Sequence, residues 1–332
     1  MPVTQLSAFQ TGLIRSSARV LSRRGPHASL LVLIYHRVLP ACDSMLPSEP
    51  DATEFASILD LLATNFNVLP LREAVTRLRG GTLPTRSVCI TFDDGYANNF
   101  TVALPLLRER NLPATVFVAP GYLNGGCMFN DVIFEACRVA PQVIALDDIG
   151  LGTFELPDAA SRVRAAQSIV ARLKYLPLGE RQRRTDQLSD RIGRPPPADL
   201  MMTDAQVEMM SRSGIEIGAH TMTHPILARV PEDEARSEIV RSRQRLEEIT
   251  GTPVLSFAYP NGKPGRDYES AHVRMVQDAG FELAVSTSWG AATAQADAFQ
   301  IPRVAPWDRS ALRYAARMVN AYRQRTFDCA RS

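Results

Sequence analysis

Short apolar runs alternate with amphipathic helical patterns along most of this 332-residue chain. A short apolar run bounded by turn residues is typical of a buried strand, and strands that alternate with helices favour a parallel sheet covered by helices. The runs that predict strands are residues 30–35, 67–69, 88–92, 115–119, 215–219, 254–259, 283–286 and 299–304. The clearest helical patterns are residues 51–65, 231–250 and 266–279. We therefore expect an α/β protein in which parallel strands form either a barrel or an open sheet.

Residues 125–200 interrupt this alternation. They contain no strong strand pattern, and the best helical patterns within them are residues 161–176 and 179–192. Three consecutive prolines, residues 195–197, follow and are typical of a stiff linker. We interpret the segment as a helical insertion and not as a separate domain.

The composition is that of a globular protein. Hydrophobic residues make up 45% of the chain and charged residues 22%, which is enough for a sizeable core. The formal net charge of +2 offers no reason to expect nucleic acid as a partner. Basic residues nevertheless crowd one region, namely Arg162, Arg164, Arg172, Lys174, Arg181, Arg183, Arg184, Arg191 and Arg194. A solvated helical surface is the simpler interpretation, and a docking surface for an anionic glycan or lipid headgroups is the alternative.

The five cysteines are odd in number and form no Cys-x-x-Cys pair, so a reducing compartment fits best. No secretory signal or transmembrane segment is visible, and we expect a cytoplasmic protein, with membrane association as an alternative. The N-terminal segment is amphipathic, with an apolar face formed by Leu6, Phe9, Leu13 and Val20. We expect this face to dock on the protein's own core, and peripheral membrane contact is the other interpretation.

Two adjacent carboxylates end one of the predicted strands. Asp93 and Asp94 directly follow the apolar run 88–92, and Gly95 permits a tight turn after them. Catalytic residues of parallel α/β proteins gather where strands end. Two neighbouring carboxylates ionise together at low cost only when a cation shares the site.

Two imidazoles end a second predicted strand. His220 and His224 follow the run 215–219, and a helical turn there would put both rings on one face. One carboxylate and two imidazoles form a three-ligand metal site with an open position, while the second carboxylate is left as a base. Zinc is the default metal for this donor set, with cobalt, nickel or manganese as alternatives.

The sequences Thr91-Phe92-Asp93-Asp94-Gly95 and His220-Thr221-Met222-Thr223-His224 resemble the first two motifs of the polysaccharide deacetylases. This is the carbohydrate esterase family 4, or NodB-homology group. The resemblance covers roughly residues 28–306 apart from the insertion. It implies a distorted (β/α) barrel in which Asp93 is the catalytic base. Asp94, His220 and His224 would then bind the metal.

The third family motif is altered here. It usually reads Arg-x-Pro-aromatic-Gly, and its arginine orients the base, but this chain reads Ala258-Tyr259-Pro260-Asn261-Gly262. Arg303, at the end of the last predicted strand, is the best replacement for that arginine by position. The backbone amide near Asn261 would help to stabilise the oxyanion. Tyr259 is a weaker candidate for the substrate groove.

The family's C-terminal Leu-x-His motif, which supplies the general acid, is absent. Leu33-Ile34-Tyr35-His36 near the start of the chain instead resembles the circularly permuted branch, typified by deacetylases of poly-N-acetylglucosamine. In that branch the N-terminal histidine is the acid, so the resemblance assigns that role to His36. Trp289 corresponds to an aromatic residue that lines the acetyl pocket, although ordinary core packing explains it equally well.

These observations divide the chain into an N-terminal helical extension (1–27), a catalytic domain with its insertion (28–310) and a C-terminal helix (311–332). We predict a metal-dependent hydrolase that removes the N-acetyl group from an N-acetylated amino sugar in a polysaccharide or glycan intermediate. A deformylase or other amidase acting on a lipid-linked amino sugar, and a catalytically impaired carbohydrate-binding protein, are the alternatives. The sequence does not determine the oligomeric state.

Overall fold

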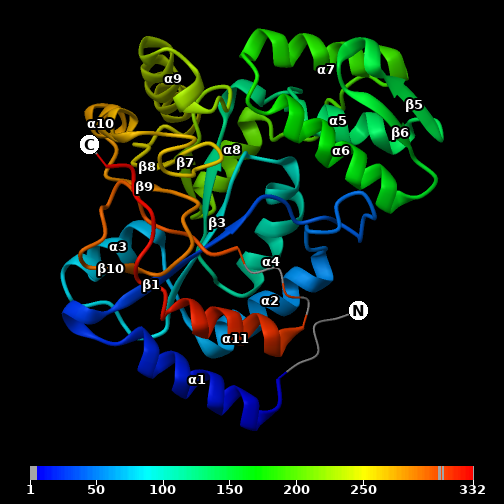
Figure 1. Ribbon diagram of the computed structural model, residues 1–332. Coiled ribbons are helices and arrows are strands. Elements are labelled where there is room, and N and C mark those ends of the chain that lie inside the picture. The colour runs from blue at the N-terminus through cyan, green and yellow to red at the C-terminus, as the bar shows by residue number, and fades with distance from the viewer. Residues whose placement is uncertain (1–5, 306–307, 309, 332) are drawn as a thin grey trace.

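The structure is a computed structural model that describes residues 6–305, 308 and 310–331. Its centre is a curled parallel sheet, as the apolar runs predicted (Figure 1). The neighbouring strands, in spatial order, are β1 (Ser29–Tyr35), β3 (Ser87–Phe92), β4 (Thr115–Val118), β7 (Glu216–Ala219), β8 (Ser256–Ala258) and β9 (Leu283–Val285). Two short strands flank them: β2 (Asn67–Val68) pairs with the start of β3, and β10 (Ala292–Thr293) runs antiparallel to β1.

The segment 299–304 was predicted as a full strand, and this prediction is wrong. It forms only two isolated parallel bridges, Ile301 with Val285 on β9 and Val304 with Leu33 on β1. Pro302 lies between the bridges and has no N–H to donate, which explains why the ladder is not continuous. Because the segment touches both edge strands, it closes the curled sheet into a distorted barrel.

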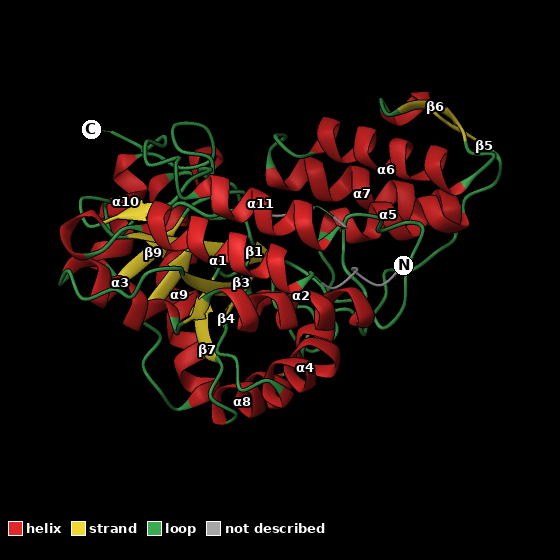
Figure 2. Cartoon of the chain, turned by 90° about the horizontal axis from the view of Figure 1, so that it is seen from below, coloured by secondary structure: helices red, strands yellow, loops and turns green. Residues whose placement is uncertain are grey.

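Helices cover the outside of the sheet (Figure 2). They are α2 (Ala52–Asn65), α3 (Leu71–Arg79), α4 (Leu104–Glu109), α8 (Asp204–Arg212), α9 (Glu232–Thr250) and α10 (Ser270–Asp278). The first predicted helix and the second agree with α2 and α9 to within a residue. The third starts at Ser270 and not at residue 266, because Gly265 donates its backbone N–H to Tyr268 in a tight turn.

The insertion forms a lobe beside the barrel, with a hydrophobic cluster of its own (Figure 1). Its helices are α5 (Phe129–Val139), α6 (Ala159–Leu173) and α7 (Leu178–Ile192). It also contains an antiparallel hairpin, β5 (Val143–Leu146) and β6 (Gly152–Glu155), which corrects the purely helical interpretation. Alternate β5 residues are exposed, so no continuous apolar run marked this strand.

The N-terminal helix α1 (Ala8–Ser22) packs against α2 and α11 (Ala311–Ala321). Ile14 and Ala18 are buried in the core, and Leu6 of the predicted face also packs against it, so the helix docks on the protein's own core as expected. Phe9, Leu13 and Val20 are 81%, 57% and 72% exposed, so the rest of the predicted face does not take part in this docking. The C-terminal helix ends at Ala321, where residues to 332 were expected to be helical. Among the described residues, no helix has both the length and the apolar character needed to cross a membrane.

Candidate active site

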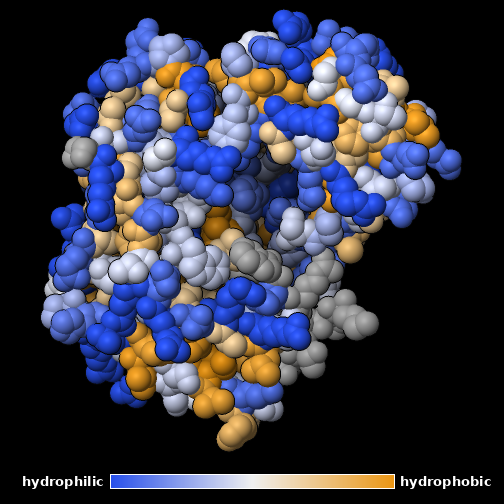
Figure 3. Space-filling view, in the orientation of Figure 1, coloured by the Kyte–Doolittle hydropathy of each residue, from blue (hydrophilic) through white to orange (hydrophobic). Residues whose placement is uncertain are grey.

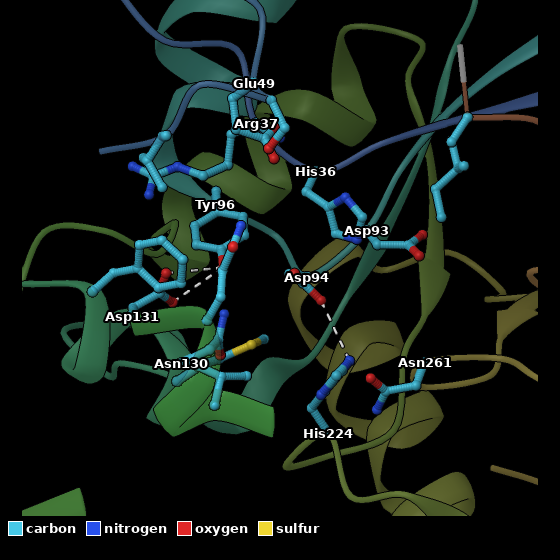
Figure 4. A pocket seen from close by; sticks show the side chains of 18 of the residues that line it. His36, Arg37, Glu49, Asp93, Asp94, Tyr96, Asn130, Asp131, His224 and Asn261 are labelled. Carbon is cyan, nitrogen blue, oxygen red and sulfur yellow. Dashed lines mark hydrogen bonds and ion pairs between the residues drawn. The ribbon is translucent and has the colours of Figure 1, made fainter. Parts of the chain in front are cut away.

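The polar residues that end the parallel strands meet at one edge of the barrel (Figure 4). Asp93 and Asp94 follow β3, His220 follows β7 and His36 follows β1. Asn261 follows β8 by three residues. Parallel strands present their carboxyl ends at the same edge, which is why residues so distant in sequence lie together.

Asp94, His220 and His224 form a cluster that can hold a metal ion. One ligand atom from each lies within 4.8 Å of the others. The Nε2 atoms of His220 and His224 are each 3.5 Å from Oδ1 of Asp94. The Nδ1 of His220 lies 2.7 Å from the carbonyl oxygen of Ala258, which can only accept, so the Nε2 lone pair faces the cluster. A carbonyl that fixes the tautomer in this way is the usual support for a metal-binding histidine.

The two histidines are brought together by a turn and not by the expected helix. Residues 220–226 contain no helix, and Thr221 and His224 have φ values of 61° and 53°. Asp94 has a φ of 78°. Residues other than glycine are uncommon in this left-handed region, and a β-branched threonine is especially unfavourable there. Such strain concentrates at functional sites, where the surrounding fold holds it in place.

Arg303 forms a buried bidentate ion pair with Asp93. Its two terminal nitrogens donate to the two carboxylate oxygens at 2.7 Å each, and Nε donates to the carbonyl of Ser286 at 3.0 Å. Arg303 is 1% exposed and Asp93 is 3% exposed. Burial alone would raise the pKa of Asp93, but the charge and hydrogen bonds of Arg303 outweigh it and lower that pKa. The pair therefore keeps Asp93 ionised and its carboxylate oriented.

The pKa values of Asp94, His224 and His220 are shifted in different directions. Burial would raise the pKa of Asp94, but the hydrogen bond to His220 acts against burial, and the net shift of that pKa is downward. Burial and the neighbouring His220 lower the pKa of His224 to about 3, so this imidazole is neutral and able to bind a metal. Burial opposes a charge on His220 as well, but Asp93 and Asp94 outweigh it and raise the pKa of His220. Metal binding requires the neutral imidazole and therefore acts against this upward shift.

The cluster lies at the bottom of a pocket of about 720 Å³ between the barrel and the insertion. Figure 3 shows this hollow on the face seen in Figure 1. His36, Asn261 and Trp289 line it, and Trp289 also packs against the core, so both interpretations of this residue hold. Tyr259 does not line it: its ring is fully buried and stacks on Tyr268 with centroids 3.8 Å apart, which overturns the prediction of a groove residue.

A second polar group lies in the pocket, and the sequence predictions did not include it. Asp131, on α5 of the insertion, accepts a hydrogen bond from the Tyr96 hydroxyl at 3.0 Å (Figure 4). Burial raises the pKa of Asp131 to about 7. The guanidinium of Arg37 lies 4.7 Å from the centre of the Tyr96 ring. No strand-end motif marks Asp131, because it lies on a helix of the insertion.

The family model described as polysaccharide deacetylase matches residues 80–169 and 177–284. The chain belongs to the polysaccharide deacetylase family. Deacetylation of a glycan, by hydrolysis of an amide bond, is the reaction class that membership implies.

Individual relatives match the chain at sequence identities of 17% to 22%. YxkH of Bacillus subtilis (strain 168), which carries a polysaccharide deacetylase name, is 20% identical over 279 residues, covering 83% of this chain and 71% of that protein. The Streptococcus pyogenes deacetylase PplD, solved in complex with acetate, has a TM-score of 0.59 and 17% identity, covering 88% and 98% of the two chains. IcaB from Ammonifex degensii has a TM-score of 0.57 and 22% identity, covering 90% and 98%. The two solved structures share the fold of this chain, and at these identities the similarity concerns the fold alone.

Removal of the Arg303 guanidinium should destabilise this deacetylase-family protein strongly. Arg303→Met leaves the Asp93 carboxylate buried without a partner, and we expect a loss of about 3–5 kcal/mol in the free energy of unfolding. The double variant Arg303→Met/Asp93→Leu should lose less, because it buries no unpaired charge. Urea denaturation measures both, and an unchanged midpoint for Arg303→Met would contradict the buried pair.

Asp131 should make the stability of the protein depend on pH. Its pKa of about 7 in the folded state exceeds the value near 3.9 expected in the unfolded chain, so the folded state binds the extra proton between these values. The free energy of unfolding should therefore fall as pH rises through this window, by roughly 4 kcal/mol in total. Asp131→Asn removes the titration but can still accept from Tyr96. After chelator treatment, the variant should have a larger free energy of unfolding than wild type at pH 8 but not at pH 4. The same difference between variant and wild type at both pH values would contradict the raised pKa of Asp131.

Proposed function

We propose that this chain is a metal-dependent hydrolase that removes the N-acetyl group from an N-acetylated amino sugar in a polysaccharide or glycan intermediate. The observation that carries the proposal is the division of labour between two adjacent carboxylates. Asp93 is paired with Arg303, whereas Asp94 faces two imidazoles. Family membership supports the reaction class, and the pocket above both carboxylates provides room for a sugar.

Asp94, His220 and His224 are the proposed ligands of a divalent metal. The donor set of one carboxylate and two neutral imidazoles fits zinc, and it also accommodates cobalt, nickel or manganese. When bound, the metal supplies a Lewis acid that lowers the pKa of a water molecule and polarises the acetamide carbonyl. The carbonyl of Ala258 holds His220 in the tautomer that such binding requires.

Asp93 is the proposed base. It remains ionised because Arg303 lowers its pKa, so it is ready to accept the proton of the attacking water. Arg303 also prevents the carboxylate from rotating, since both oxygens are held at once. In this chain Arg303 thus takes the orienting role that the altered third motif no longer provides.

His36 is the proposed acid. It lies beside Asp93 in the pocket, and its charge is close enough to lower the pKa of both Asp93 and Asp94 (Figure 4). As water forms its bond to the carbonyl carbon, the carbonyl oxygen gains negative charge, and the backbone N–H near Asn261 is the proposed donor to it. His36 then gives a proton to the sugar nitrogen as the carbon–nitrogen bond breaks, and acetate leaves. We propose Trp289 as a wall of the acetyl pocket.

The two alternative functions predict different products: one would release formate, and the other would release nothing. A deformylase acting on a lipid-linked sugar would use the same residues but release formate. A catalytically impaired carbohydrate-binding protein would bind oligomers without turnover. The oriented base beside an unbroken ligand set favours an active enzyme over the impaired protein, because sugar binding alone requires neither.

Asp93→Asn should reduce kcat by about 10²–10⁴-fold, the range typical of lost general base catalysis. The zinc-reconstituted variant should keep its metal, because Asp93 is outside the ligand set, whereas His224→Ala should lose it. Acetate and formate release from N-acetylglucosamine oligomers, with metal content measured by elemental analysis, tests both points. Wild-type turnover by Asp93→Asn would exclude it as the base, and formate without acetate would favour the deformylase.

His36→Ala should lower kcat by roughly 10²-fold and leave KM and metal content nearly unchanged, because His36 acts on the departing nitrogen. His27→Ala is the matched control: His27 is exposed and does not line the pocket, so its turnover should equal that of wild type. If His36→Ala also turns over at the wild-type rate, the proton comes from another group.

A further inference from the structure

The chain contains only two lysines, Lys174 and Lys263, and both line the active-site pocket. All other basic side chains of the printed sequence are arginines and histidines. Lys174 follows helix α6 of the insertion, and Lys263 lies in the loop after β8. Two segments that are distant in sequence therefore bring ammonium groups to one cavity.

Three cations lie around the ring of Tyr175, and of these three only Lys174 lines the pocket itself. The Lys174 ammonium and the Arg229 guanidinium are each 5.6 Å from the centre of the Tyr175 ring, and the Arg266 guanidinium is 4.6 Å from it. We call Lys174, Arg229, Lys263 and Arg266 the Tyr175 cluster. Within the described part of the chain, none of its four side chains has a carboxylate within ion-pair distance.

One buried carboxylate, that of Asp267, lies against the cluster. Asp267 is 1% exposed, and its carboxylate accepts from the Tyr175 hydroxyl at 3.2 Å and from the backbone N–H of Lys263 at 3.1 Å. It thereby ties the insertion to the loop after β8. Its charge raises the pKa of Lys174, but burial and the neighbouring Arg266 and Lys263 have the opposite effect and lower that pKa. The cluster thus sets four cations against one buried carboxylate and keeps a net positive charge.

The positive side of the pocket extends toward the metal ligands. Arg181, on α7, lines the same cavity and is 7% exposed, with its guanidinium 4.3 Å from the centre of the Phe129 ring. Arg181, Lys174 and Lys263 therefore line the cavity that holds Asp94 and His224, which allows one extended ligand to touch both ends.

We propose that the Tyr175 cluster binds an anionic group, a carboxylate or a phosphate, carried by the glycan whose acetamido sugar lies over Asp93 and Asp94. This inference rests on the proposed function and narrows its substrate to an acidic glycan. Arg229, Lys263 and Arg266 are exposed and Lys174 is half-buried, so all four are accessible to a ligand, but a neutral chain of N-acetylglucosamine would make no use of their charge. An anionic substituent would instead pair with ammonium and guanidinium donors, which are strong partners for both groups.

The kinetic test uses matched oligosaccharides with one acetamido sugar. One is neutral, one carries a uronate and one carries a sugar phosphate. Wild type should show a kcat/KM for at least one acidic oligomer on the order of tenfold or more above that for the neutral one, and this preference should shrink as salt is added. Lys174→Gln/Lys263→Gln should lose the preference mainly through KM. Arg183→Gln/Arg194→Gln is the charge-matched control, because both arginines are exposed and outside the pocket.

A binding test needs neither a variant nor turnover. Chelator-treated wild-type protein is acetylated with an amine-reactive reagent, and modification of Lys174 and Lys263 is followed by peptide mass spectrometry. An acidic oligomer should slow modification of both lysines, and the neutral oligomer should not. Protection by the uronate, the phosphate or both identifies the anion recognised.

The two tests separate the two proposals. Protection by an acidic oligomer without release of acetate from any substrate would retain the anion site and overturn the proposed reaction. Acetate release with equal kcat/KM for neutral and acidic oligomers, and no protection by either anion, would overturn the anion site alone.

Discussion

The buried pair between Arg303 and Asp93 is the interaction on which both the barrel and the site depend. Two charges withdrawn from water are tolerated only when they satisfy each other, and here the guanidinium fork matches both carboxylate oxygens. Arg303 belongs to the irregular segment that bridges β9 and β1, whereas Asp93 directly follows β3. The pair therefore adds a side-chain link from this closing segment to β3, beyond the backbone hydrogen bonds that join the segment to β9 and β1. The same contact keeps Asp93 ionised.

The cluster of Asp94, His220 and His224 depends on backbone conformations that the fold must hold in place. Asp94 is turned away from Asp93 by its left-handed conformation, and Gly95, with a φ of 89°, continues the turn. A Cβ atom on Gly95 would come within 2.9 Å of the Val118 side chain on β4. Adjacent carboxylates consequently point to different partners, which explains how neighbouring residues in sequence can have different roles.

The insertion changes the character of the pocket. The strand ends contribute the acids and imidazoles of the floor, whereas α5, α6 and α7 bring Asp131, Lys174 and Arg181 to its walls. The barrel thus carries the residues proposed for the reaction, and the insertion carries charges suited to recognising the rest of a glycan. This separation is consistent with the family's shared chemistry and with a substrate preference particular to this chain.

Local periodicity and composition were sufficient to predict the parallel strands, α2, α9 and the adjacent carboxylates, because burial on both faces of a strand requires a continuous apolar run. The sequence alone also determined that Asp93, Asp94, His220 and His36 follow strands. Only the tertiary structure decided how these residues meet. It replaced the expected helical turn after β7 with a left-handed one, reduced the Pro302 segment to two bridges and buried Tyr259 away from the pocket. It also brought Lys174 of the insertion and Lys263 of the loop after β8 to the same pocket. Such contacts join residues far apart in the chain, and no local pattern encodes them, because their energy comes from packing and charge pairing between elements and not from the propensity of any one segment.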